Sequence, residues 1–345
     1  MDLTSAMSCV SNDDVKAAIF SREILRNPGR SLSPSMQLLH DAGKLCLAWL
    51  EAATAPMSGA YAFVLSEHPA LDDAIDDSKF PNLRNLQKAS VHDIIDTRIF
   101  VCSANLKVSF SPEFGSRNTS QIISWLGANG IGDRPTLVFQ PTEGMILWYP
   151  DGVATGTAIN YVTDLQKEDV FDLEKYADHF HEHWTKWPTG FGGKIWHDHK
   201  ERIVIKRAED CVRDDLFVYL SLVVYRTGNI VRENLMTNGR SDLWIYSRYS
   251  GDTAGSAVVE LKVLRSKSFS IDKKARTYSD KVIEEYVKKG IRQASEYKAS
   301  GKAEKAFCWC FDARAANNNL PVHPNAISAG VSLKLFWMES NFKGR

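Results

Sequence analysis

The sequence predicts an α/β (α+β) protein whose C-terminal half is built around a central mixed sheet. Two observations point to this class. Helical and strand-like runs follow one another in the order α-β-β-β-α-β, and a Pro/Gly segment, WPTGFGGK, precedes them. The runs are a helix at 207–226, strands at 229–237, 241–249 and 255–265, a long helix at 277–301 and a strand at 305–313.

The N-terminal half predicts a mixed α+β domain. A capped helix is expected to begin near Ser11, and a stronger helix begins at Ser33-Pro34. The apolar face of that second helix comprises Leu38, Leu39, Ala42, Leu45, Cys46 and Trp49. Further along, we expect a loop-rich segment at 55–90, strands within 98–111, a short helix at 116–130, a hairpin at 136–152 and a helix near 172–187.

Placing the linker at 188–194 divides the chain into domains 1–190 and 195–345. No motif in the first domain indicates chemistry, so we assign it recognition, sensing or oligomerisation.

Composition excludes some classes of protein. Lys plus Arg and Asp plus Glu both number 42, so any attraction to nucleic acid must come from local patches. No apolar run is long enough to span a bilayer, and no secretory signal is seen at the N-terminus. Cys308 and Cys310 have apolar neighbours, which indicates buried thiols in a reducing compartment. We therefore expect a cytoplasmic protein without a membrane partner.

Charged residues interrupt two strand-like runs, NGRSDLWIY and AVVELKVLR. Buried charges are costly unless they are paired or hold a metal. Strand alternation directs Glu260 and Lys262 to one face, and pairing of the two strands would bring Asp242 close to Glu260. Both carboxylates and the Leu261 carbonyl would then form a half-shell for Mg²⁺ or Mn²⁺, with Lys262 beside the metal-bound water. The alternative is a surface salt bridge among the three side chains.

This pattern resembles the PD-(D/E)XK nuclease superfamily over about residues 200–315. The carriers are Gly239-Arg240-Ser241-Asp242, Glu260-Leu261-Lys262, and a QxxxY motif of the RecB-like type that runs from Gln293 to Tyr297. The resemblance implies a restriction-endonuclease-like fold and metal-dependent phosphodiester hydrolysis, with Gln293 near the metal and Tyr297 meeting the nucleic acid. It also implies a further acid, for which the candidates are Glu233, Glu209, Asp210, Asp214 and Asp215. Ser241 replaces the usual proline, and the four-cysteine set of iron–sulfur relatives is missing.

Basic residues gather around the helix that carries Gln293. They are Lys273, Lys274, Arg276, Lys281, Lys288, Lys289 and Arg292. A basic patch beside a metal site suits a polyanionic substrate, although Glu284 and Glu285 on the same helix are compatible with a merely solvated face. We assign Lys288, Lys289, Arg292 and Arg240 to nucleic-acid contact. Tyr278 and Tyr297 are candidates for base stacking, whereas Tyr286 is expected in the core.

The function expected from these residues is that of a metal-dependent nuclease, acting on DNA rather than RNA, in antiphage defence or restriction. The resemblance to the family also implies a homodimer, and we expect an activating or regulatory partner. The alternatives are an inactive nuclease-fold binding module, an RNA-directed nuclease, and a zinc enzyme. Candidate zinc ligands are His179, His181, His183, His197 and His199. The chain has no GxxxxGK[ST] phosphate loop, which argues against a built-in ATPase.

Overall fold

The fold was analysed in a computed structural model of the chain. It describes residues 32–340 except 54–56, 67–81, 84–85, 87–97, 108, 112–117, 157, 163–171, 186–194, 237–238, 248–254, 270–274 and 318–319. The expected helix near Ser11, the linker at 188–194, and Lys273 and Lys274 all lie outside the described residues.

A seven-stranded sheet forms from the N-terminal half, in the order β2-β4-β3-β1-β5-β6-β7. Its strands are β1 (Tyr61–Leu65), β2 (Asn82–Leu83), β3 (Ile99–Cys102), β4 (Ser109–Phe110), β5 (Thr136–Gln140), β6 (Met145–Tyr149) and β7 (Ile159–Val162). Helices α2 (Pro34–Ala52) and α4 (Thr119–Ala128) accompany it, with short 3₁₀ turns η5 (Pro141–Glu143) and η6 (Val153–Thr155). The helix predicted from Ser33-Pro34, the short helix predicted at 116–130 and the β5–β6 hairpin are confirmed. Ser33 caps α2 by accepting a hydrogen bond from the Met36 N–H.

The segment expected to be loop-rich, 55–90, contains a central strand instead. All five residues of β1 are buried, and the strand pairs with β3 in parallel and with β5 in antiparallel orientation. Its sequence, YAFVL, is a continuous apolar run without alternation. A run this short, buried on both faces, carries no periodic signal to identify it.

The C-terminal half contains the predicted α-β-β-β-α-β order. These elements are α7 (Ala208–Val223), β10 (Gly228–Met236), β11 (Gly239–Ser247), β12 (Ala257–Leu264), α8 (Asp280–Gly301) and β15 (Lys305–Asp312). The sheet order is β10-β11-β12-β15-β16. The first three strands are antiparallel and the last three are parallel, so the mixed sheet is confirmed.

Several short elements supplement this core. They are α5 (Leu173–Thr185), β8 (Trp196–Asp198), β9 (Ile203–Val204), β13 (Lys267–Phe269), β14 (Ala275–Thr277), α9 (His323–Ala329) and β16 (Ser332–Trp337). Only α5 was expected from the sequence. Strand β16 pairs in parallel with β15 and extends the sheet by one strand.

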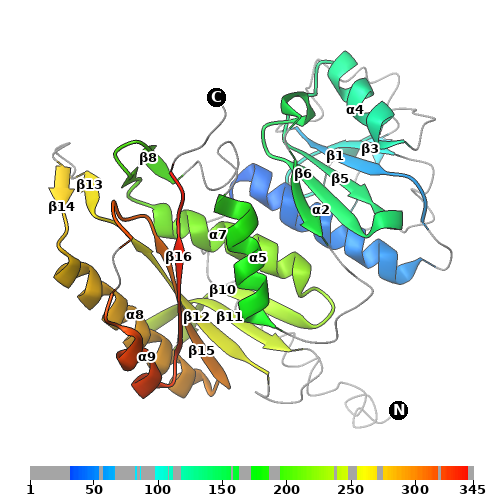
Figure 1. The fold of residues 1–345 in the computed structure, drawn as a ribbon. Coiled ribbons are helices and arrows are strands. Elements are labelled where there is room, and N and C mark those ends of the chain that lie inside the picture. Colours follow the sequence, from blue (N-terminus) through cyan, green and yellow to red (C-terminus); the bar gives the residue numbers. More distant parts are fainter. Residues whose placement is uncertain are drawn as a thin grey trace, which may run out of the picture. The chain divides into compact units, whose positions relative to one another are not determined.

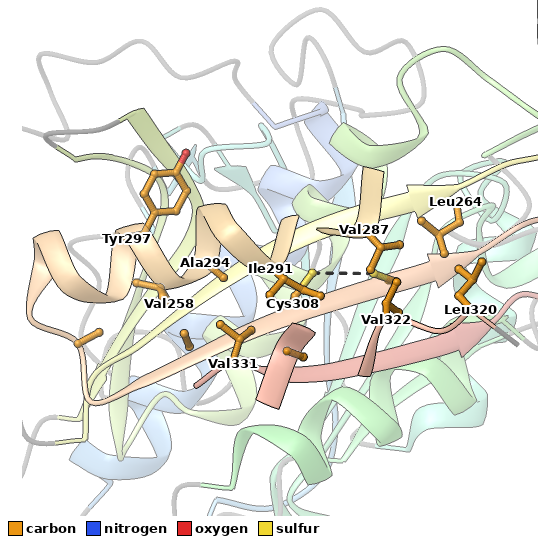
Figure 2. Close-up of a cluster of buried hydrophobic side chains, with 14 of the residues drawn as sticks. Val258, Leu264, Val287, Ile291, Ala294, Tyr297, Cys308, Leu320, Val322 and Val331 are labelled. Carbon is orange, nitrogen blue, oxygen red and sulfur yellow. Dashed lines mark hydrogen bonds between the residues drawn. The ribbon is translucent and has the colours of Figure 1, made fainter. Parts of the chain in front are cut away.

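Helices cover both faces of the five-stranded sheet (Figure 1). On one face, α8 and α9 pack over a cluster that includes Val258 and Cys308 (Figure 2). On the opposite face, Phe180 of α5 contacts both Tyr219 of α7 and Phe311 of β15. Because side chains alternate along β12, Glu260 and Lys262 share the face of Val258, beneath α8. The expected polar site therefore lies at the sheet–α8 layer.

Each of the two large sheets takes its strands from only one side of residues 188–194. The division into two domains stays a prediction. Among the described helices, none is both long enough and apolar enough to cross a membrane.

Candidate functional site

The candidate site lies where β11 and β12 stop pairing. Their ladder runs from Ile245↔Ala257 to Leu243↔Val259, which places Asp242 and Glu260 next in register. Beyond that point, side chains take the backbone groups of β12. The N–H of Leu261 donates to Oδ2 of Asp242 at 2.8 Å. The sequence prediction that strand pairing would bring Asp242 to the ExK strand is confirmed.

The next N–H on this edge of β12 is bound by a second carboxylate. The N–H of Val263 donates to Oε2 of Glu209, which stands in the first turn of α7, at 3.3 Å. Buried backbone donors nearly always find partners, and here two carboxylates replace the missing strand. The open edge of β12 is thus lined with acidic oxygens.

Glu260 and Lys262 are both buried, with 3% and 4% exposure, so the surface salt bridge considered from the sequence is wrong. The ammonium of Lys262 donates to Oε1 of Glu260 at 2.5 Å and to the Leu261 carbonyl at 3.0 Å. These are two of the three ligands predicted for a metal. Oε2 of Glu260 is buried and has no hydrogen-bond partner among the described residues. A buried carboxylate oxygen without a partner is costly, so this oxygen is available to a further ligand.

The electrostatics of the site reflect several acids around one ammonium. Burial, reinforced by the charge of Asp242, raises the pKa of Glu260 to about 8. Burial also raises the pKa of Asp242, opposed by the charge of Lys262 and the N–H of Leu261. Burial alone would lower the pKa of Lys262, but the charges of Glu260, Glu209 and Asp242 raise it above its ordinary value. Lys262 therefore stays protonated at neutral pH.

Among the candidates for the additional acid, Glu209 is the one that reaches this cluster. Its Oε1 lies 3.9 Å from Nζ of Lys262, and its Oε2 accepts a hydrogen bond from the Tyr286 hydroxyl at 2.7 Å. Asp210 pairs with Arg207 and Arg213, and Asp214 pairs with Arg232. Asp215 is buried, with 7% exposure.

Glu233 approaches the site only through an arginine. It faces Asp242 across the β10–β11 ladder, and its backbone has φ 54°, a left-handed conformation unusual for a residue with a side chain. Nη1 of Arg213 lies 3.0 Å from Oε1 of Glu233 and 3.5 Å from Oδ1 of Asp242. The other oxygen of Glu233 pairs with Arg240 at 3.1 Å. Glu233 was predicted as a catalytic acid, but the structure gives it two guanidinium partners instead.

The QxxxY motif lies on α8 as expected, but its tyrosine is not at the surface. Tyr297 is 3% exposed and packs in the core (Figure 2). Its hydroxyl lies close to the backbone of Gly239. Nε2 of Gln293 donates to Tyr297 Oη at 3.5 Å, and no hydrogen bond connects it to Glu260 or Lys262. Tyr286, which was expected in the core, is 36% exposed. The predicted environments of both tyrosines are therefore wrong, and burial prevents Tyr297 from stacking on a base.

The basic residues of α8 differ in how far they are neutralised. Lys288 pairs with Glu284 at 2.6 Å and with Glu285 at 3.2 Å. Arg292 is exposed, with its nearest acid, Glu296, at 3.9 Å. Lys289 is exposed, and no ion pair is formed by it within the described part of the chain. Of Lys288, Lys289 and Arg292, the last two are therefore more available to an anion.

Sequence reasoning did not assign Tyr286 or Arg213 to the site. A signal for Tyr286 existed, because it precedes Gly290 by four residues and Gln293 by seven, which places all three along one face of α8. Arg213 carried no comparable signal, since an arginine within a helix is ordinarily solvated.

The histidines do not form a metal centre in the described part of the chain. Nδ1 of His179 hydrogen-bonds to the Tyr219 hydroxyl at 2.5 Å, and Nε2 of His181 to the Trp337 carbonyl at 2.7 Å. Within the same residues, no three His, Cys, Asp or Glu side chains converge closely enough to hold a metal ion as they stand. At the candidate site, the ammonium of Lys262 occupies the position between the acids.

The donor set nevertheless fits a hard divalent cation. Asp242, Glu260 and the Leu261 carbonyl offer oxygen ligands, which Mg²⁺ and Mn²⁺ prefer. The unpartnered Oε2 of Glu260 supplies a free coordination position. A cation bound there would take oxygens that the Lys262 ammonium now contacts, so the ammonium would have to move aside.

No protein-family model matches the chain, and no curated protein matches its sequence. Among solved structures, the chain is similar to SfsA of Pyrococcus furiosus, determined in complex with Ca²⁺, at 17% identity and a TM-score of 0.23. The alignment covers 37% of this chain and 58% of that one. A TM-score of this size does not establish a common fold, so the assignment of function rests on the site itself.

Proposed function

We propose that this protein is a metal-dependent nuclease of the PD-(D/E)XK type that hydrolyses phosphodiester bonds in nucleic acid. The proposed substrate is DNA in preference to RNA, and the proposed location is the cytoplasm. The observation that carries the proposal is the divergence of β11 from β12, which gathers Asp242, Glu260 and the Leu261 carbonyl around Lys262. The α-β-β-β-α-β order of the surrounding elements supports it.

Each residue of the site has a proposed role that follows from its chemistry. Asp242, Glu260 and the Leu261 carbonyl would hold Mg²⁺ or Mn²⁺, and Glu209 is the additional acid in reach. Such an ion supplies Lewis-acid polarisation of the phosphate and lowers the pKa of bound water. Because the surrounding carboxylates raise the pKa of Lys262, its ammonium is suited to orienting the attacking water and stabilising negative charge on the phosphorane. It is poorly suited to accept a proton.

Substrate contact is proposed along the exposed side of α8. Lys289 and Arg292 stand within one turn of Gln293 and are exposed, so they can pair with phosphates on a strand that approaches the site. Arg240 is 53% exposed at the start of β11, two residues before Asp242. A homodimer and a role in antiphage defence are proposed from the resemblance alone.

The proposal is tested by incubating the protein with supercoiled plasmid, linear duplex, single-stranded DNA and RNA, in Mg²⁺, Mn²⁺ or EDTA. We expect cleavage that needs metal and is lost in Asp242→Asn and Lys262→Met. Glu143→Gln, which alters an exposed acid of the N-terminal half, serves as the control and should cleave normally.

Calorimetric titration with Mn²⁺ separates the alternatives. Cleavage of RNA alone would favour the RNA-directed nuclease. Binding of nucleic acid without cleavage, together with no Mn²⁺ binding that depends on Asp242, would refute the enzyme and leave a binding module.

A further inference from the structure

Tyr286 joins two helices that lie on opposite faces of the sheet. It belongs to α8, and its hydroxyl donates to Oε2 of Glu209 on α7 at 2.7 Å. Its ring centroid is 5.4 Å from Nζ of Lys262. The oxygen that accepts the Tyr286 hydrogen bond, Oε2 of Glu209, also accepts a hydrogen bond from the N–H of Val263 on β12.

Glu209 needs such an anchor if it is to act at a fixed position. Its side chain is 32% exposed, and glutamate loses substantial rotamer freedom when it is held. The N–H of Val263 alone binds it at 3.3 Å, a long hydrogen bond. The Tyr286 hydroxyl adds a shorter bond to Oε2, which leaves Oε1 directed toward Lys262 at 3.9 Å.

A ligand site at this point is supported by more than a group of acids. Glu260 is 3% exposed, and its Oε2 has no partner among the described residues. The ammonium of Lys262 already bonds to two of the oxygens that would ligate a metal. A cation in this position would lie on the side of Glu209 that Tyr286 leaves free.

We propose that Tyr286 is a positioning residue of the metal site: its hydroxyl holds Glu209 so that Oε1 becomes the third carboxylate oxygen available to a divalent cation. The proposal rests on the proposed function. Tyr286 itself would not contact the reacting atoms, because the Tyr286 hydroxyl donates its hydrogen bond to Glu209.

The test is calorimetric titration of the full chain with Mn²⁺, using wild type, Tyr286→Phe, Glu209→Gln and the double variant. Tyr286→Phe keeps the ring beside Lys262 and removes only the hydroxyl. Loss of a partner that orients a metal ligand typically weakens binding by about 10-fold or more, which is the effect we expect. Glu209→Gln should weaken binding at least as much, and the double variant should bind no more weakly than Glu209→Gln.

Tyr61→Phe is the matched control. The hydroxyl of Tyr61 is buried in the N-terminal sheet without a hydrogen-bond partner among the described residues, so its removal should leave Mn²⁺ affinity unchanged. Urea unfolding of each variant verifies that the fold is intact. A structural defect would lower the unfolding midpoint, whereas a positioning role would change Mn²⁺ affinity alone.

The outcomes distinguish failure of this inference from failure of the proposed function. Wild-type binding of Mn²⁺ that does not depend on Asp242 would overturn the proposed function and this inference with it. Asp242-dependent binding that Tyr286→Phe leaves within twofold of wild type would overturn the inference alone. Further weakening by Tyr286→Phe in the Glu209→Gln background would also overturn it, because Tyr286 would then act by another route.

Discussion

Replacing Gly290 by alanine tests whether α8 is packed directly against the site lysine. A Cβ built at Gly290 would lie 3.0 Å from Sγ of Cys308 and 3.1 Å from both Cγ and Cε of Lys262. Favourable contacts between carbon atoms begin at about 3.5 Å, so each neighbour would have to retreat. Neither has much room, since Cys308 is fully buried and Lys262 is held by Glu260 and the Leu261 carbonyl.

Two opposing contributions determine how much Gly290→Ala changes the free energy of unfolding. Alanine within a helix gains about 1 kcal/mol over glycine, because its unfolded chain has less conformational freedom to lose on folding. Adding a methyl group to a closely packed interior costs about 1–3 kcal/mol. The net change in the free energy of unfolding for Gly290→Ala should therefore be a loss of about 0–2 kcal/mol. Displacing Lys262 by a few tenths of an ångström should also slow cleavage, by about tenfold.

The assay is urea unfolding followed by circular dichroism, beside the plasmid cleavage assay. Gly127→Ala is the matched control, because Gly127 lies in helix α4 and an added Cβ would meet nothing within 4 Å. It should stabilise the protein by about 1 kcal/mol and leave cleavage unchanged. If Gly290→Ala were stabilised as much as Gly127→Ala, with full activity, the argument for close packing on Lys262 would be refuted.

Three further predictions concern the charges of the site. Lys262→Met should abolish cleavage yet bind Mn²⁺ at least about fivefold more tightly. The reason is that a positive charge near the metal position opposes binding by about 1 kcal/mol or more. Weaker binding of Mn²⁺ in calorimetry would contradict this prediction. Burial raises the pKa of Glu260 to about 8, so a proton competes with the metal for this carboxylate below pH 8. Mn²⁺ affinity should therefore rise from pH 6 to 8 and level off at higher pH. An affinity that does not change with pH would argue against Glu260 as a ligand. Glu233→Gln should weaken Mn²⁺ binding several-fold by releasing Arg213 toward Asp242, and the same substitution in an Arg213→Met background should have no effect unless Glu233 is itself a ligand.

The main features of the C-terminal half were predictable because they depend on local pattern. Strand alternation alone placed Glu260 and Lys262 on one face, and the α8 helix was marked by its long amphipathic run. Pairing of β11 with β12 followed from their succession in the chain. These inferences needed no knowledge of distant contacts.

What the sequence did not reveal depends on tertiary arrangement. The interposition of Arg213 between Glu233 and Asp242 requires α7 to lie beside β10 and β11, which no local spacing indicates. The tyrosines illustrate the same point. Tyr286 and Tyr297 both lie on α8, but only the position of the helix over the sheet decides that Tyr297 faces the core and Tyr286 the solvent.

A neighbouring pair of charges shows why the Glu260–Lys262 pair is better explained by function than by stability. Asp312 and Arg314 have the same i, i+2 spacing, and Asp312 ends β15, the strand next to β12. Both oxygens of Asp312 accept hydrogen bonds from the Arg314 side chain, at 2.6–3.1 Å, so this buried pair satisfies its carboxylate. Glu260 satisfies only one oxygen, and Asp242 and Glu209 add negative charge beside it.

Well-packed apolar residues generally stabilise a core as well as a buried ion pair does, and an incomplete pair is worse than either. Stability alone would therefore favour valine or leucine at these positions of β12. An acid left partly unpaired next to two others, with one ammonium between them, suits the proposed metal site, in which a divalent cation would take the oxygens that Lys262 now contacts.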